Sequence, residues 1–169
     1  MKSFLQNRAS ACVWIGGKRK LNKWKWSHSG ARITYSSWYP NEPDGRGGIF
    51  ATENCIEATP TGSFDWNDLS CLAKCHSICQ TRWNGKQQKI YDLPDCGAHG
   101  GKGYGQSCYV YRSDKLKWNE AKESCIQLNM HLVEISEEDE NSFVRYYIMS
   151  LKSHRTLGKP WNDAHKINH

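Results

Sequence analysis

The sequence has few hydrophobic residues and no long apolar run. Hydrophobic residues make up 38% of the 169 residues, and the mean hydropathy is -0.78. A helix needs about 20 consecutive apolar residues to cross a bilayer. No stretch of the chain offers them, so we expect no membrane span. The opening residues, MKSFLQNRAS, also lack the apolar core of a secretory signal peptide.

The sequence also lacks a recognisable catalytic nucleophile. Covalent catalysis needs a side chain such as Ser or Cys that a neighbouring base, most often His, activates. No Ser or Cys stands in a pattern that suggests such a partner. We therefore expect a binding protein and not an enzyme.

Cysteine and aromatic residues, in contrast, are plentiful. The chain has eight Cys, eight Trp, eight Tyr and four Phe. An even number of Cys in a chain of this size favours a disulfide framework formed in an oxidising compartment. Large aromatic side chains can build a core from few positions. We expect a secreted or extracellular domain and, since no signal peptide is visible, a fragment of a longer protein.

Positive charge is concentrated in one short stretch. The net charge is +6, and basic residues alternate with Trp in KRKLNKWKW at residues 18–26. Basic residues among aromatic ones are one signature of nucleic-acid binding. The same alternation suits a half-buried strand pair with Lys outside and Trp inside. Because the chain is rich in Cys, we favour the strand pair and expect no nucleic-acid partner.

Hydrophobic periodicity predicts an α+β fold. Apolar residues recur on one helix face within residues 118–129, and Ser136 followed by acidic residues suits the start of another helix. Residues 28–54 predict a long loop, and loops of this length are often functional. The predicted strands are 11–17, 23–27, 55–58, 63–67, 76–81, 104–112 and 131–135, and the predicted helices are 2–10, 118–129 and 136–149.

Five side chains in and after the long loop offer oxygen ligands. Several carboxylates without a soft sulfur ligand suit Ca²⁺, which takes about 6–8 oxygen atoms. A cis peptide before Pro43 would aim its two acidic neighbours the same way. Asp and Asn are also common turn formers, so the residues alone leave both interpretations open. The five lie in NEPDG, ENC and WND, and are Glu42, Asp44, Glu53, Asn67 and Asp68.

At these residues the sequence resembles the C-type lectin-like domain family. The resemblance rests on VWIGG, W…EPD, ENC, WNDLSC and SICQ, then on CGAHGGKGYGQSCYVY, WNEAKESC and HLVEISEEDENSFV. It implies an α+β fold with two helices packed on small antiparallel sheets and a long loop. Residues 1–82 (the first segment) resemble the C-terminal part of such a domain, and residues 96–149 (the second segment) resemble its N-terminal part. We expect a linker at 83–95 and a disordered tail at 150–169.

The resemblance implies a calcium-dependent carbohydrate-binding lectin. In the family, one Ca²⁺ is held by a Glu-Pro-Asn or Gln-Pro-Asp tripeptide, a Glu before a Cys and a Trp-Asn-Asp motif, and two sugar hydroxyls coordinate that ion. The five side chains match these roles for both Ca²⁺ and sugar. The tripeptide here, Glu-Pro-Asp, is a hybrid of the mannose-type and galactose-type forms. The resemblance therefore implies a glycan ligand, with a role such as innate immunity, but leaves the sugar open.

The resemblance also implies how the cysteines pair. Family-like positions pair Cys55 with Cys71, Cys96 with Cys108 and Cys79 with Cys125, and the two left over, Cys12 and Cys75, would form a fourth bridge. The two segments occur in reversed order. The chain either folds as one circularly permuted domain or is a fragment of a tandem-domain lectin. A homo-oligomer or a domain-swapped dimer is compatible with the fragment.

Two alternatives compete with the calcium lectin, and one repeated motif does not. The same fold can serve as an interaction domain for protein or mineral surfaces without sugar. A Zn²⁺ site in CLAKCHSIC would use Cys71, Cys75, His76 and Cys79, although the spacing is not the usual C-x2-C. A second WND at residues 161–163 lacks the neighbouring Glu and Cys, and we expect no metal there.

Overall fold

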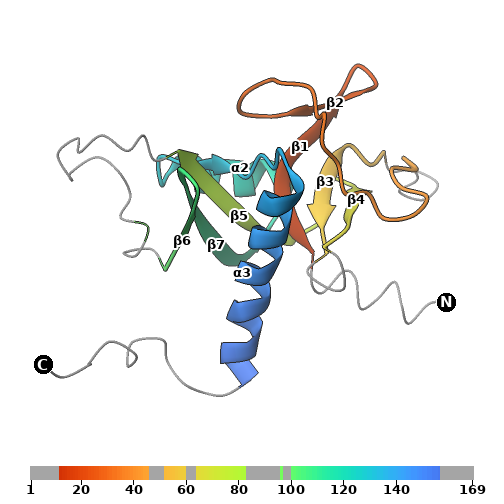
Figure 1. Ribbon diagram of the computed structural model, residues 1–169. Coiled ribbons are helices and arrows are strands. Elements are labelled where there is room, and N and C mark those ends of the chain that lie inside the picture. Colours follow the sequence, from red (N-terminus) through yellow and green to blue (C-terminus); the bar gives the residue numbers. More distant parts are fainter. Residues whose placement is uncertain (1–11, 46–51, 60–63, 83–95, 97–99, 157–169) are drawn as a thin grey trace, which may run out of the picture.

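The structure, a computed structural model, describes residues 12–45, 52–59, 64–82, 96 and 100–156 (Figure 1). These residues form a mixed β-sheet and two helices, which confirms the predicted α+β class. The elements are β1 Val13–Lys20, β2 Lys23–Trp26, β3 Cys55–Ala58, β4 Trp66–Leu69, β5 Cys75–Arg82, β6 Lys102–Tyr104, β7 Ser107–Leu116, α2 Trp118–Ile126, β8 His131–Leu132 and α3 Glu138–Thr156.

Both segments contribute strands to the sheet. The strand order is β4-β3-β1-β5-β7-β6, with β2 paired to β1 and β8 paired to β5. The junction is the long antiparallel pairing of β5 with β7, which runs from Cys75 opposite Leu116 to Arg82 opposite Ser107. The last strand of the first segment therefore lies beside strands of the second segment.

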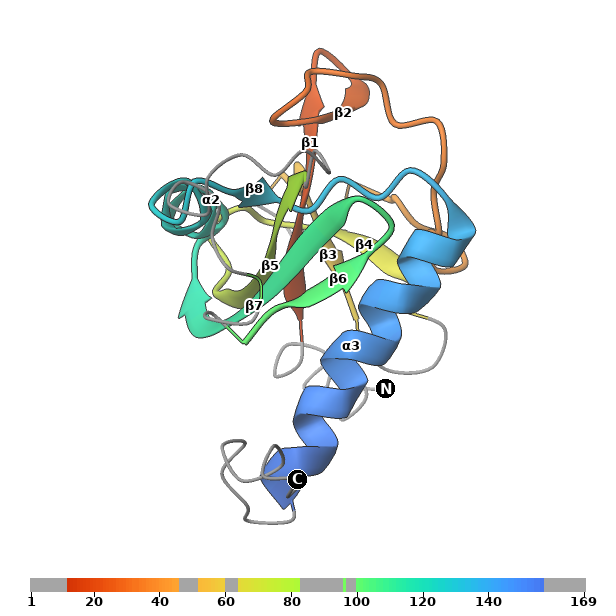
Figure 2. The ribbon, with the colours of Figure 1, turned by 60° about the vertical axis from the view of Figure 1, so that its left-hand side comes forward.

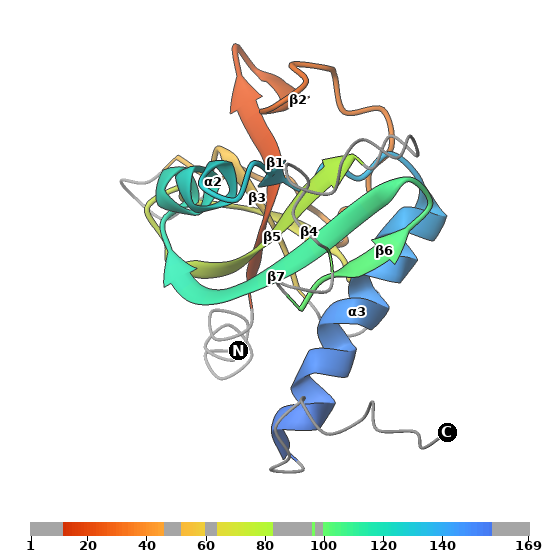
Figure 3. The same cartoon turned by 90° about the vertical axis from the view of Figure 1, so that its left-hand side faces the viewer.

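The two helices lie on opposite sides of the sheet and cover separate cores (Figures 2 and 3). Successive strand residues point to opposite faces. Accordingly, Val13 and Ile15 of β1 belong to the core that includes Val144 and Ile148 of α3, whereas Trp14 belongs to the core on the α2 side. Alternate residues of VWIG in β1 thus contribute to the two cores on opposite faces of the sheet.

Helix α2 buries the face that the sequence predicts. Trp118, Ala121 and Cys125 are buried. The indole Nε1 of Trp118 donates to the carbonyl of Ile15 at 2.9 Å. Buried indole N–H groups need such partners, and this one ties the second segment to β1.

Several predicted boundaries are wrong. The strand predicted at 104–112 is a hairpin, because Gly105 adopts φ +56° between β6 and β7. Ser136 is not the N-cap of α3: its backbone N–H and its hydroxyl donate to the Glu140 carboxylate, and α3 begins at Glu138.

Helix α3 also continues through part of the predicted tail. It runs to Thr156, so residues 150–156 are helical and not a disordered tail. Leu151 follows Ile148 by three positions and packs against the same core, which continues the apolar helix face. The predicted helix at 2–10, the linker at 83–95 and the second WND at 161–163 lie outside the described residues.

Four disulfides join the expected cysteines. They are Cys12–Cys75, Cys55–Cys71, Cys79–Cys125 and Cys96–Cys108. The Cys79–Cys125 bond joins β5 of the first segment to α2 of the second. Cys71, Cys75 and Cys79 are all oxidised, which overturns the Zn²⁺ alternative because zinc ligation needs the free thiolate.

Candidate functional site

Three of the five candidate ligands converge at the long loop. Glu42, Asp44 and Asp68 each offer a carboxylate oxygen, and these oxygens all lie within 4.8 Å of one another. Two oxygens that share one Ca²⁺ at about 2.4 Å are at most about 4.8 Å apart. The three side chains, called here the carboxylate cluster, are therefore close enough to hold one ion together.

Asp68 is the buried anchor of the cluster. It lies on β4 and is 0% exposed. Its two carboxylate oxygens accept the backbone N–H groups of Asp44 at 3.2 Å and Gly45 at 2.9 Å. These bonds fold the loop onto β4, which is 24 residues further along the chain.

A tight turn presents the other two carboxylates. The Glu42–Pro43 peptide is cis, the isomer that would aim both acidic neighbours the same way. The backbone N–H of Glu42 donates to the Tyr39 carbonyl at 2.9 Å, and that of Asp44 donates to the Glu42 carboxylate at 3.2 Å. Glu42 is half-buried and Asp44 is exposed, so the turn opens the cluster to solvent.

Glu53 lies close enough to the carboxylate cluster for the negative charges of the cluster to shift its pKa. Its pKa is raised to about 7, first by burial and then by the negative charges of Asp68, Asp44 and Glu42. A carboxyl among other carboxylates holds its proton because like charges oppose its ionisation. A divalent cation at this place would remove that repulsion.

Asn67 is the fifth candidate. It is near the carboxylate cluster because it is the neighbour of Asp68 in the chain. It precedes Asp68 in β4 and pairs across the sheet with Glu57 of β3. Its role as a ligand stays a prediction.

An aromatic cluster supports the loop. Trp66 is fully buried, and its backbone N–H donates to the Ser37 carbonyl at 2.6 Å while its own carbonyl accepts from Tyr39 at 2.8 Å. Trp38 packs edge-on against Trp66 with 6.0 Å between ring centroids. The loop residues 37–39 are thereby fixed against β4 two positions before Asp68, a relationship that the sequence motif alone does not reveal.

The donor set fits a calcium ion. All the donors are hard oxygens, and at least three are carboxylates, which suits Ca²⁺ better than a soft-ligand metal. The two hydrogen bonds to Asp68 do not exhaust it, because an ionised carboxylate has about four lone-pair sites. The same residues can therefore keep the loop folded and still ligate an ion.

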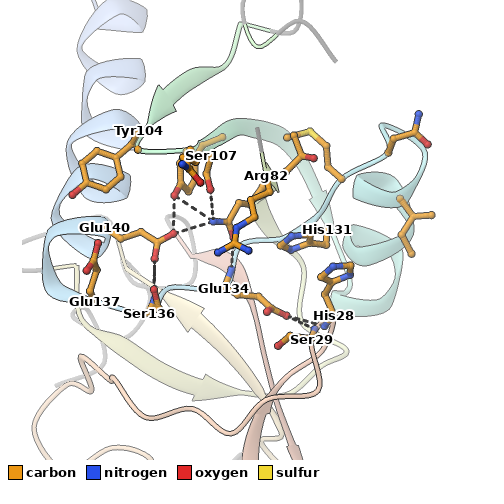
Figure 4. A pocket seen from close by; sticks show the side chains of 18 residues that line it. His28, Ser29, Arg82, Tyr104, Ser107, His131, Glu134, Ser136, Glu137 and Glu140 are labelled. Atoms are coloured by element: carbon orange, nitrogen blue, oxygen red, sulfur yellow. Dashed lines mark hydrogen bonds between the residues drawn. The ribbon is translucent and has the colours of Figure 1, made fainter. Parts of the chain in front are cut away.

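A hollow separate from the carboxylate cluster lies between β5, β7 and α3 (Figure 4). At its base the buried carboxylate of Glu140 accepts hydrogen bonds from Tyr109 at 2.7 Å, from Gln80 at 3.0 Å and from Ser136 at 2.9 Å. Each oxygen of this acid accepts two hydrogen bonds, and these four bonds fill its about four lone-pair sites. We therefore assign the Glu140 network to structure and not to ligand binding.

Several known proteins resemble this chain. It is 35% identical over 69 residues to perlucin from Haliotis laevigata, covering 40% of this chain and 43% of that protein. It is 34% identical over 79 residues to type-2 ice-structuring protein from Hemitripterus americanus, covering 46% and 45%. The match to C-type mannose receptor 2 from Homo sapiens is 29% over 137 residues, or 78% of this chain and 9% of that protein. All these relatives are C-type lectin-like proteins, which supports a C-type lectin-like domain in this chain.

The lectin-like chain spans less than half the length of these relatives. No protein-family model and no solved structure matches it. The match to the mannose receptor is longer than either segment, so that receptor carries counterparts of both segments in the order seen here. Among the described residues, no helix is long and apolar enough to cross a membrane.

Proposed function

We propose that this lectin-like chain is a calcium-dependent carbohydrate-binding module. Glu42, Asp44, Glu53, Asn67 and Asp68 hold one Ca²⁺, and two neighbouring sugar hydroxyls complete its coordination. The observation that carries the proposal is the convergence of three carboxylates from two distant stretches of chain within 4.8 Å. Binding, not catalysis, is the activity.

The chemistry of the site favours a sugar as the further ligand. Ca²⁺ takes about 6–8 oxygens, and five side chains leave open positions that hydroxyl groups can fill. Carboxylates accept hydrogen bonds from those same hydroxyls. Asp44 stands where an Asn would both donate and accept, so the hybrid tripeptide offers acceptors only. Mannose-type and galactose-type sugars therefore remain competing candidates.

The proposed place of action is extracellular. Four disulfides support an oxidising compartment, where lectins meet glycans on cell or microbial surfaces. We also propose that both segments of one chain form a single lectin-like unit in reversed order, supported by the β5–β7 pairing and the Cys79–Cys125 bond.

Titration calorimetry tests the proposed function directly. Ca²⁺ is added first to the metal-free protein, and mannose, fucose and galactose are then added to the loaded protein. Asp68→Asn removes the charge of one ligand with little change in side-chain shape. It should abolish the heat of Ca²⁺ binding and the heat of sugar binding. Glu123→Gln, on α2, is the matched control and should bind normally. Absence of Ca²⁺ binding by the unaltered chain at millimolar concentration would refute the proposal.

A second candidate function is a non-sugar surface-binding domain. The likeness to a protein named for structuring ice favours it, because that name denotes no sugar. Calcium binding without any response to the sugar panel would support this candidate over the lectin.

A further inference from the structure

The hairpin of β1 and β2 projects from the sheet (Figures 1 and 2). Its strand register places lysines on one face. Lys18 lies opposite Lys25, and Lys20 lies opposite Lys23. Residues directly opposite in an antiparallel pair share a face, as do residues two apart in one strand. The four side chains therefore form one patch, called here the lysine face.

The lysine face continues on both sides of the hairpin. Arg32 forms an isolated antiparallel bridge with Lys25 and adds a fifth cation in the same row. On the other side, the Lys18 ammonium donates to the Asn119 side chain at 3.3 Å and lies 4.7 Å from the centroid of the Trp118 ring. The patch thus extends from the hairpin to helix α2.

A sixth cation lies close to Lys18. Burial lowers the pKa of Lys18, and repulsion by Lys122 of α2 lowers it further. A nearby anion would relieve that repulsion.

No acidic partner offsets this charge among the described residues. Their ion pairs are Arg112–Asp114 and Lys117–Glu120, and neither includes a residue of the lysine face. Like charges directly opposite one another in a sheet are destabilising. The hairpin therefore holds an uncompensated row of positive charge that the fold itself does not require.

The lysine face is on the side of the hairpin that points away from the carboxylate cluster. Arg19 alternates with the lysines, lies opposite Trp24 and approaches Gly45, the residue after Asp44. Trp24 packs against Trp38 of the long loop with 5.3 Å between ring centroids. The side of Arg19 and Trp24 therefore faces the loop, and the lysine face points away from it.

We propose that the lysine face binds a sulfated linear polysaccharide by charge, independently of Ca²⁺. Cations that repeat about every 7 Å along two strands about 5 Å apart suit an extended polyanion better than a single small anion. The disulfides favour sulfated polysaccharide over nucleic acid, because they indicate an extracellular setting. This surface adds a second ligand class to the chain.

The test measures binding of a fluorescent heparin oligosaccharide by anisotropy, with EDTA present throughout so that the carboxylate cluster takes no part. We expect binding that weakens steeply with salt, because neutralised charges release counterions. The same oligosaccharide backbone without sulfate should bind at least about tenfold more weakly, since most of its charge is lost. A DNA duplex of equal length is the competing polyanion.

A double variant and a charge-matched control locate the surface. Lys20→Gln with Lys23→Gln should weaken heparin binding by roughly tenfold or more, taking each lysine near a polyanionic surface as worth about fivefold. Lys74→Gln with Lys115→Gln removes the same charge near the start of β5 and the end of β7. Because β1 runs parallel to β5, that end of the sheet is opposite the hairpin tip. The control should lose less than about threefold.

Three results would overturn the inference. Equal losses in the two double variants would mean that net charge, not the lysine face, attracts the ligand. Heparin binding that appears only when Ca²⁺ replaces EDTA would assign it to the calcium site. Tighter binding of the DNA duplex than of heparin would make nucleic acid the ligand class. All variants are surface substitutions, and circular dichroism verifies that each is folded.

Discussion

The indole of Trp66 and the side chain of Asn141 form a buried hydrogen bond, with 3.1 Å between Nε1 and Oδ1. Trp66 opens the WND motif beside the carboxylate cluster, and Asn141 lies on α3, 75 residues further along. Both residues are buried. The bond links the first segment, which carries the site, to a helix of the second segment, and it makes the site dependent on both.

Asn141→Leu should therefore destabilise the protein. The substitution leaves the Trp66 N–H buried without an acceptor, which costs about 1–3 kcal/mol. For a domain of this size we expect the melting temperature to fall by roughly 2–4 °C per kcal/mol. Met149→Ala, an exposed position on the same helix, should change it little. Unaltered melting of the Asn141→Leu variant would show that the bond contributes nothing to stability.

Calcium binding should weaken as the pH falls below about 7. The raised pKa of Glu53, about 7, means that this carboxyl is partly protonated near neutrality in the metal-free protein. Ca²⁺ needs the ionised form, so binding releases a proton at neutral pH and releases less at higher pH, where the group is already ionised. Calorimetry in buffers of different ionisation enthalpy measures the proton release. Glu53→Gln should remove it, and an unchanged proton count in that variant would contradict the assignment.

Acid should also destabilise the fold through His131. Burial is the main cause that lowers the pKa of His131 below 6.5, and its ring stacks on that of His28 with 4.0 Å between centroids. The unfolded chain therefore binds a proton at this residue more readily than the folded one. Its contribution to stability is complete above about pH 6.5 and declines as the pH falls below that value. Urea unfolding across this range should show a shallower pH dependence for His131→Phe than for the unaltered protein.

The disulfide between Cys79 and Cys125 should form within one chain and stabilise it substantially. It closes a separation of 46 residues, and the loop-entropy relation gives about 4 kcal/mol for a loop of that length. Replacing both cysteines with Ser should lower the urea midpoint accordingly. Peptide mapping of the non-reduced protein, combined with its native mass, determines whether the bond is internal. A Cys79–Cys125 link found only between two chains would indicate a domain-swapped dimer and contradict the single-unit proposal.

Much of the fold could be predicted from the sequence, because local patterns carry it. The alternation of β1 and the buried face of α2 match expectation. The four cysteine pairs match what the resemblance to the lectin-like family implied, which no local pattern could supply. The misplaced boundaries have causes that propensity does not resolve. Gly105 could have lain within a strand, and only its positive φ makes it a turn. Leu151 extends α3 because it packs against the hydrophobic core, and that core is built from residues far apart in the chain.

The sequence by itself determined which atoms could serve as ligands: five oxygen-bearing side chains, in motifs typical of C-type lectin-like domains, and a stretch of alternating Lys and Trp. It could not determine which of those atoms meet. The tertiary structure decided that Glu42 and Asp44 reach Asp68, because hydrogen bonds to a buried carboxylate fold a distant loop onto β4. The alternation predicted that the lysines share one side of the strand pair, and the strand register decided which lysines stand opposite one another. Side-chain types are local properties, whereas convergence depends on contacts between residues far apart in the chain.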